Sequence, residues 1–515
     1  MNISTEPWIP VVWADGTPGT VSLGDAFARG EEIRDLAVRP YERIALMRLL
    51  VCVAQAALNG PADENGWKAC RSELASKALA YLRNWHHAFE LFGDGPRFLQ
   101  VAGLRQRPGK NNYEEDILAS KLDLTLATGN NPTLFDNAGG SERTFTPAQL
   151  ALMLLTFQCF SPGGRISVAE WNNRPTLGNG SSEHAPCIAD NMLHAIVRGE
   201  NLLDTIHLNL MTKDQAKGLF DQDKWGKPVW EAMPQGLNDK PAISNATGTY
   251  LGRLVPLSRC IRLNDDCRTI ILANGLNYPK FQEFREPTAT VVLQGGTKRA
   301  LLRASVEKAI WRELHALVVL TKDKNSPGGP VALANVRDAP AFDLWVGGLV
   351  AKQAKLIDAV EAVFHVPKAM LYDRAQRLYE QGVRHSEMTE DQLCRAISAY
   401  RLGLETNTED LGGLKRRFTS LKNPERERLR SLSAKAIAQF WSDVEQAVPL
   451  LLDIVTHPEQ LGDNDWHKTK WGEAVWRAAI TAYEHACPRA TPRQMRAYVF
   501  GLQAFTNKDS QEAEK

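Results

Sequence analysis

The sequence contains no run of apolar residues approaching the roughly 20 that a membrane-spanning helix requires. Its first ten residues carry no Lys or Arg and no long apolar stretch, so we expect no secretory signal and a cytoplasmic protein. The motifs GxSxG, GxxxxGK[ST] and HExxH are all absent. These absences argue against a membrane protein, a serine hydrolase, a P-loop nucleotide-binding protein and a zinc protease.

Paired cysteines are also missing. The eight cysteines are scattered and no CxxC pair occurs, which favours reduced thiols over disulfides. Cys260 and Cys267 are the only close pair, and we find no further ligands of similar spacing that would complete a zinc site. We therefore expect no metal and no cofactor. The formal net charge is only +1, which excludes a protein that is basic over its whole surface but not one with a local basic face.

The length of 515 residues, with 43% apolar residues, predicts several structural units with large cores. We expect an α+β protein with a large mixed domain over residues 1–365, containing antiparallel sheet elements and helices. A four-helix bundle should follow over residues 366–505, with a frayed tail at 506–515. Within these domains, we expect a hairpin over residues 8–23, β-rich structure over 248–305, helices over 67–92, 148–160 and 347–364, and a helix kink at Pro449.

The segment 128–140 is rich in Gly, Asn and Pro yet carries Leu134 and Phe135. Long loops without secondary structure are usually functional or disordered, and an apolar pair argues against disorder. Such a tip could wedge base pairs while amide groups read the minor groove, and Gly163-Gly164 would allow a close backbone approach. On local physics alone, a loop that packs Phe135 into its own domain remains the stronger interpretation.

Residues 411–435 form a locally basic segment with eight Lys or Arg and two Glu. A stripe that contacts phosphates and a solvated helix face with Glu–Arg pairs are about equally good explanations. Lys415, Arg416 and Arg417 precede Phe418, and a ring beside positive charges slightly favours nucleic acid, since it could stack on a base.

Asp265 and Asp266 provide the alternative of a metal-dependent nuclease working with a histidine, although a turn rich in Asp needs no metal. His86 and His87 are adjacent on an expected helix and point apart, which does not suit a metal site.

Several stretches together resemble the CasA family, the large subunit of the type I-E CRISPR Cascade complex. The similar stretches occur in the family's order over essentially the whole chain: Glu6–Val11, Pro96–Gln100, Asn131–Asp136, Ile196–Leu202 and Trp311-Arg312, with residues from about 366 as the C-terminal bundle. The resemblance implies a non-catalytic subunit of a crRNA-guided complex. Such a subunit recognises the short motif beside the target (the PAM) in double-stranded DNA, helps to open the duplex, and recruits a helicase-nuclease.

The resemblance also implies partners and site residues. The partners are crRNA, target DNA, the small-subunit dimer, the subunit that caps the crRNA 5′ end, and the helicase-nuclease. The implied PAM-contacting residues are Asn131, Leu134, Phe135, Asp136, Gly163, Gly164, Arg165, Lys280, Lys352 and Gln353, and Lys415, Arg416, Arg417 and Lys422 are the backbone-contacting candidates of the bundle. A scaffold whose long loop contacts only proteins remains an alternative. The family's glycine loop has only two consecutive glycines here, and Ala351 or Lys352 stands where the family suggests Asn, so the preferred PAM is left open.

Overall fold

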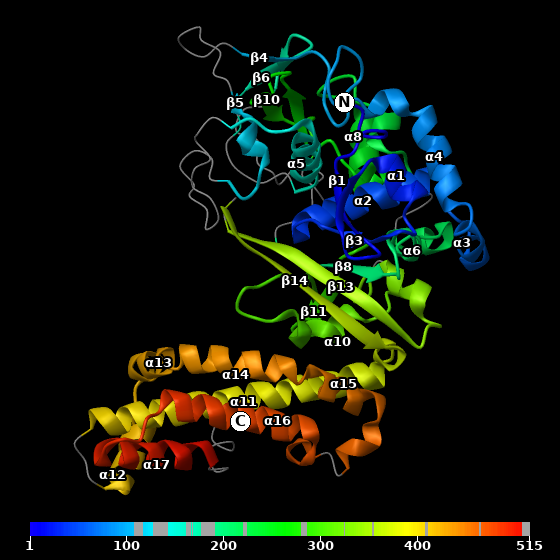
Figure 1. Ribbon diagram of the computed structural model, residues 1–515. Coiled ribbons are helices and arrows are strands. Elements are labelled where there is room, and N and C mark those ends of the chain that lie inside the picture. Colours follow the sequence, from blue (N-terminus) through cyan, green and yellow to red (C-terminus); the bar gives the residue numbers. More distant parts are fainter. Residues whose placement is uncertain are drawn as a thin grey trace. The chain divides into compact units, whose positions relative to one another are not determined.

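The computed structural model describes residues 1–107, 117–126, 143–160, 166, 168–176, 191–219, 224–279, 286–323, 325–352, 355–406, 410–462 and 465–506. The chain divides into two units, Met1–Lys368 and Ala369–Lys515, where the sequence predicted a boundary at 365/366. The first unit mixes helices and strands and the second is helical, so the predicted α+β class is confirmed (Figure 1). Among the described residues, no helix has the length and apolar character needed to cross a bilayer.

The first unit opens with a small antiparallel sheet in the order β2-β1-β3. Its strands are β1 (Ile9–Trp13), β2 (Pro18–Val21) and β3 (Ile33–Leu36). The first two form the predicted hairpin, with Ile9 opposite Val21 and Val12 opposite Pro18. Helix α1 (Leu23–Ala28) follows β2 and begins with a capping box between Ser22 and Asp25.

A group of helices supplies most of this unit's core. Helix α2 (Pro40–Ala57) is buried along almost its whole length, and α5 (Pro147–Phe160) occupies the position predicted for an apolar helix. The single helix predicted over 67–92 is wrong, because the chain forms α3 (Glu64–Cys70), α4 (Leu74–Asn84) and a short 3-10 turn at His86–Phe89. Trp67 of α3 stacks on His207 at 4.4 Å, and it enters the same main core as Leu74, Ala78 and Leu82 of α4.

Three further small sheets lie among the described residues of the same unit. One has the order β5-β10-β9, with β5 (Ile117–Leu118), β9 (Arg259–Leu263) and β10 (Thr269–Asn274). The second joins β4 (Leu104–Gln106), β6 (Ala169–Trp171) and β7 (Arg174–Pro175), and in the third β11 (Val291–Gln294) pairs with β12 (Lys298–Leu301). The predicted β-rich region thus begins later than expected, since Tyr250–Leu254 forms helix α9. The remaining helices of this unit are α6 (Leu202–Leu208), α7 (Lys213–Leu219), α8 (Lys240–Gly248) and α10 (Leu314–Leu317).

The predicted helix over 347–364 is also wrong. These residues belong to a long hairpin of β13 (Ala341–Lys352) and β14 (Lys355–Pro367), with β8 (His194–Arg198) on the other side of β13 (Figure 1). Along β14, the exposed residues Glu361, Val363 and His365 alternate with less exposed neighbours, which is the period of a strand. The Ala and Glu residues obscured that period, and the long pairing with β13 decided the conformation.

The second unit is built around α11 (Asp373–Glu405). Helix α16 (Lys470–Ala486) runs in the same direction, because the Trp471 indole donates to Gly382 O and the Tyr400 hydroxyl donates to Pro488 O. Helix α17 (Pro492–Thr506) runs in the opposite direction, with Ala497 packed on Gly403.

The fourth helical position of the bundle is filled by several short helices, which we call the segmented rod. It consists of α13 (Asn423–Ser431), α14 (Ala434–Gln446) and α15 (Val448–Thr456), preceded by the short α12 (Leu411–Thr419). Arg428 contacts Glu405 near the end of α11, and Leu451 lies against Gly382 near its beginning. The segmented rod is therefore antiparallel to α11, which completes a four-helix bundle, and Pro449 sits in the first turn of α15 where a kink was predicted.

Candidate nucleic-acid interface

Most residues that the resemblance assigned to PAM contact lie outside the described residues. These are Asn131, Leu134, Phe135, Asp136, Gly163, Gly164, Arg165, Lys280 and Gln353. Lys352 is the last residue of β13, and its side chain is not described. The structure therefore describes the residues that border these segments and hold their ends in place.

The stretches that border 127–142 are fixed to the turn between β9 and β10. After the segment, the Phe145 N–H donates to Cys267 O at 3.2 Å, and Arg268 Nε donates to the Thr144 hydroxyl at 2.7 Å. Before it, the Ala119 N–H donates to Arg268 O at 2.7 Å. One turn of the sheet thus holds the chain on both sides of the expected DNA-contacting loop.

The same turn contains the carboxylates of the nuclease alternative. Asp266 accepts hydrogen bonds from the backbone N–H groups of Arg268 and Thr269 and from the Thr269 hydroxyl. Partial burial favours a higher pKa for Asp266, but these hydrogen bonds hold its pKa below the ordinary 3.8. The carboxylate therefore serves the turn itself, and no group of three or more His, Cys, Asp or Glu side chains suited to a metal ion occurs among the residues with described positions.

Arg268 is a residue that the sequence reasoning missed. Its side chain is exposed, and Arg268 Nε donates to the Thr144 hydroxyl, which places the guanidinium at the border of the 127–142 segment. The signal was a cation two residues after Asp266, in a polar turn that the sequence interpreted only through its carboxylates.

The segment 161–165 follows directly on α5, whose last turn is well anchored. The buried Gln158 amide donates to Leu99 O at 3.1 Å and to Arg259 O at 2.9 Å, and it accepts from the Arg259 N–H at 2.9 Å. Phe160 packs edge-to-face with Tyr41 at 6.4 Å. The expected glycine loop thus begins from a fixed helix end.

The segment 280–285, which contains Lys280, is anchored on both sides. Before it, the buried Tyr278 hydroxyl donates to Leu257 O at 2.7 Å. After it, the buried Glu286 carboxylate forms an ion pair with Arg48, whose Nε also donates to Leu254 O at 2.8 Å. Burial alone would raise the pKa of Glu286, but Arg48 and the neighbouring Arg253 lower it.

The stretches that resemble the family are largely core elements. Trp8 is 1% exposed, and its indole donates to Ile3 O at 2.8 Å. Phe98 stacks on Phe89 at 5.7 Å, and the buried Gln100 accepts from the Leu263 N–H at 2.8 Å. These motifs therefore belong to the core of the unit. For that reason they indicate the fold of the family more directly than its binding site.

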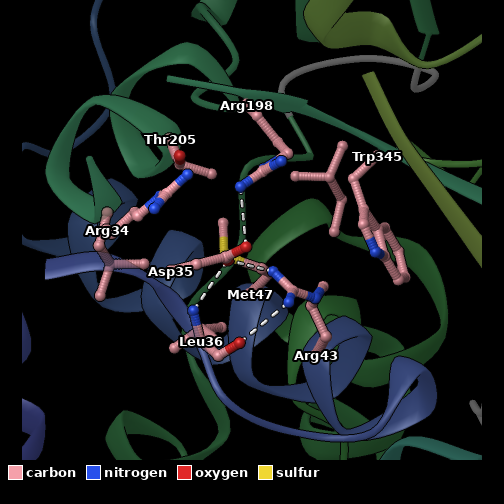
Figure 2. Close-up of a pocket in the computed structure, with 10 residues that line it drawn as sticks. Arg34, Asp35, Leu36, Arg43, Met47, Arg198, Thr205 and Trp345 are labelled. Atoms are coloured by element: carbon pink, nitrogen blue, oxygen red, sulfur yellow. Dashed lines mark hydrogen bonds and ion pairs between the residues drawn. The ribbon is translucent and has the colours of Figure 1, made fainter. Parts of the chain in front are cut away.

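A second feature of the first unit is a small pocket between β3, α2, β8 and β13. Figure 2 shows Arg34, Arg43 and Arg198 arranged around Asp35. Asp35 forms ion pairs with Arg43 and, at 2.8 Å, with Arg198. Arg198 belongs to the stretch Ile196–Leu202 that resembles the family, yet no role was assigned to it from the sequence.

In the bundle, many cations of the basic segment already have partners. Arg417 pairs with Glu425 at 2.8 Å and Arg428 with Glu405 at 2.6 Å, while Arg416 lies 3.7 Å from Asp410. Lys415 and Lys422 are exposed, and no carboxylate of the described residues lies within ion-pair distance of either. These two lysines and Lys435, which is likewise exposed and without an ion pair among the described residues, are thus the cations of the segment most available for a ligand.

The stacking role suggested for Phe418 is not supported. Its half-buried ring packs edge-to-face against Phe500, with a centroid distance of 6.2 Å, and contacts two small hydrophobic clusters of the bundle. A ring held in this way is part of the bundle's core and does not offer an open face to a base.

Comparison with known proteins identifies the family. The sequence model of CRISPR-associated protein Cse1 matches residues 2–482. The CRISPR-associated protein CasA/Cse1 of Thermus thermophilus is 30% identical over 418 residues, which cover 75% of each chain.

Solved structures agree in fold. The crystal structure of CasA from Thermus thermophilus has a TM-score of 0.70 with 23% identity over 98% of both chains. Cse1 from Acidimicrobium ferrooxidans also scores 0.70, with 20% identity over 98% of this chain and 96% of the other. A chain of a CRISPR RNA-guided surveillance complex scores 0.67, with 16% identity over 98% and 99%. The family match over nearly the whole chain, together with the 30% identical relative, shows that this chain belongs to the CRISPR-associated Cse1 family, also named CasA.

Proposed function

We propose that this chain is the non-catalytic large subunit of a crRNA-guided type I-E CRISPR surveillance complex. Its role is to recognise the PAM in double-stranded DNA, promote duplex opening and R-loop formation, and recruit the helicase-nuclease. The observation that carries the proposal is membership of the Cse1 family across residues 2–482, supported by the likeness in fold to a chain of an RNA-guided surveillance complex.

The partners follow from the same proposal. They are crRNA, target duplex DNA, the small-subunit dimer, the subunit that caps the crRNA 5′ end and, after R-loop formation, the helicase-nuclease. Guide pairing reads the target sequence in such complexes, whereas protein reads the PAM and the strand backbones. A subunit of this kind needs DNA-contacting loops on a stable framework and does not need a catalytic metal.

We assign PAM contact to Leu134, Phe135 and Asp136, with Gly163, Gly164 and Lys280 as further contact residues from two other segments. Support comes from the anchoring of each border: the β9–β10 turn for 127–142, Gln158 for 161–165, and Tyr278 with Glu286 for 280–285. Anchored borders keep a loop's end-to-end separation fixed, which lowers the ordering cost when the loop binds DNA. Arg268 is added to the set as a cation beside the first of these loops.

The test is a pair of DNA substrates offered to the assembled complex. Leu134→Ala with Phe135→Ala should weaken binding to an intact PAM-bearing duplex by at least about tenfold, because the wedge and its minor-groove contacts are lost. Binding to a target that is already opened should change by less than about twofold. Electrophoretic mobility shifts with both substrates measure the difference.

The matched control is Leu293→Ala, which removes an exposed apolar side chain of β11 elsewhere in the same unit. It should bind both substrates like the unaltered complex. Equal losses on the two substrates for the Leu134/Phe135 variant would show that the loop does not read the PAM. Failure of the chain to co-purify with crRNA and the other subunits would refute membership of the complex.

A further inference from the structure

The pocket around Asp35 contains more positive than negative charge. Its lining residues include three arginines, Arg34, Arg43 and Arg198, and a single acidic residue. Asp35 Oδ1 already accepts from Arg43 and from the Leu36 N–H at 2.8 Å, and Oδ2 accepts from Arg198 at 2.8 Å. Both carboxylate oxygens of Asp35 therefore already accept hydrogen bonds from groups other than Arg34.

Several guanidinium donors in the pocket have no acceptor. Arg43 Nε is buried and unsatisfied among the residues with described positions, although Arg43 Nη2 donates to Leu36 O at 2.9 Å. Arg198 uses only Nη2 toward described residues, and Arg34 is exposed with no described partner. The Thr205 hydroxyl is already engaged, accepting from the Gly199 N–H and donating to Asn201 O. A half-buried site with surplus cations and unfilled donors suits an anion.

The floor and the size of the pocket restrict what the anion can be. Trp345 is 2% exposed and lies beneath the Arg43 guanidinium, 5.5 Å from its ring centroid, so its ring offers no face to a ligand. The enclosed space measures about 10 Å³, which holds roughly one water-sized atom. One oxygen of an anion can enter, while the rest of the group must remain on the solvent side, where Arg34 is the exposed residue of the lining.

These features favour a phosphate group over a carboxylate metabolite. A phosphate offers several oxygens in directions that match converging guanidinium forks, and a phosphodiester can leave the mouth as a continuing strand. A whole buried metabolite would need a larger cavity. The structural role of Asp35, which joins β3 to α2 and β8, is complete without Arg34.

We propose that Arg34, Arg43 and Arg198 form a binding site for one phosphate group, filled by a phosphodiester of a nucleic-acid strand that crosses the mouth of the pocket. The choice of a phosphate rests on the pocket alone. The choice of a nucleic-acid strand as its source rests on the proposed function.

The first experiment uses the full chain and inorganic phosphate at constant ionic strength. Phosphate should bind the unaltered chain and raise its Tm, whereas Arg34→Gln should bind about tenfold more weakly. Without phosphate, Arg34→Gln should keep the Tm of the unaltered chain, because this exposed side chain has no described partner. Arg83→Gln, which removes an exposed charge from α4, is the matched control and should bind phosphate normally. Equal phosphate affinity in all three proteins would overturn the site.

The second experiment measures how binding of DNA and of crRNA to the same proteins depends on salt. Arg34→Gln should lower the slope of log K against log salt by about 1, as expected for one lost phosphate contact, and Arg83→Gln should leave it unchanged. If phosphate binding depends on Arg34 but the salt slope is unaltered for both DNA and crRNA, a nucleic-acid strand is not the source of the phosphate. The site would then be assigned to a small phosphate ligand. PAM discrimination through Leu134 and Phe135 is independent of both results, so a failure here differs from a failure of the proposed function.

Discussion

The two units of the chain use the same kind of charged side chain in opposite ways. In Met1–Lys368, the Arg48–Glu286 pair is 3% and 2% exposed, and Arg48 also bonds to backbone carbonyl oxygens of Arg253 and Leu254. In the helical unit, the Arg428–Glu405 pair is 50% and 44% exposed. A buried charge depends on its partner because no water can replace it, whereas an exposed charge loses little when its partner is removed. The buried Arg48–Glu286 pair therefore holds the fold of its unit, while the exposed Arg428–Glu405 pair contributes little to the stability of the bundle.

The largest effect should come from breaking the buried pair. Glu286→Gln keeps the side chain's size but leaves the Arg48 guanidinium buried without its carboxylate, and we expect a loss of about 3–5 kcal/mol in the free energy of unfolding. Urea unfolding combined with hydrogen exchange of the α2 amides would measure it. Glu405→Gln in the bundle is the control, with an expected loss below about 1 kcal/mol. Similar losses for both variants would remove the contrast between the units.

A smaller effect should follow pH through His194. Burial lowers the pKa of this imidazole to about 4; Glu286 acts to raise it and Arg48 to lower it further. The unfolded chain binds a proton near the ordinary pKa of about 6.5, so between these values the unfolded state holds more protons than the folded state. The contribution of His194 to stability is therefore fully present above pH 6.5 and is lost as pH falls toward 4. Between pH 7 and pH 5, the free energy of unfolding should fall by about 2 kcal/mol from this group.

Unfolding measured from pH 7 to pH 5 in the unaltered chain and in His194→Gln tests this dependence. The variant should lose about 2 kcal/mol less over that range. The stability of His194→Gln should still depend on pH, because His385 in the bundle also has a lowered pKa, about 4. Burial is the main cause, the charge of His467 adds to it, and Asp465 acts in the opposite direction. Identical pH profiles for the two proteins would show that His194 does not titrate as its burial requires.

The smallest effect on stability, but a clear effect on binding, is expected in the bundle. Lys415→Gln with Lys422→Gln should change the free energy of unfolding by less than about 0.5 kcal/mol, since both side chains are exposed. The salt slope of DNA binding by the complex should fall by about 1–2 if both lysines contact phosphates. Arg428→Gln, whose charge is already paired with Glu405, is the control and should leave the slope unchanged. An unaltered slope in the double variant would assign the basic segment to a solvated helix face.

Much of the architecture could be predicted because it depends on local patterns. The hairpin at Ile9–Val21, the apolar helix at Pro147–Phe160 and the helical C-terminal region are each encoded by periodicity and turn residues close together in the chain. The prediction of a helix over 347–364 failed because those residues acquire their conformation from a partner strand. A mixture of Ala, Val and Glu does not by itself distinguish the period of a helix from that of a strand. The stacking of Trp67 on His207, which lies far away in sequence, likewise could not be predicted from the local pattern.

The candidate sites divide in the same manner. The sequence by itself determined the family framework, through Trp8, Phe98 and Gln100, and it marked the basic segment at 411–435. Only the tertiary structure decided which cations remain available there, since the partners of Arg417 and Arg428 are set by helix packing. It alone brought Arg34, Arg43 and Arg198 together around Asp35 and placed Arg268 beside Thr144. The physical reason is that periodicity is a property of neighbouring residues, whereas the surplus or balance of charge at a site depends on groups that folding brings together from distant parts of the chain.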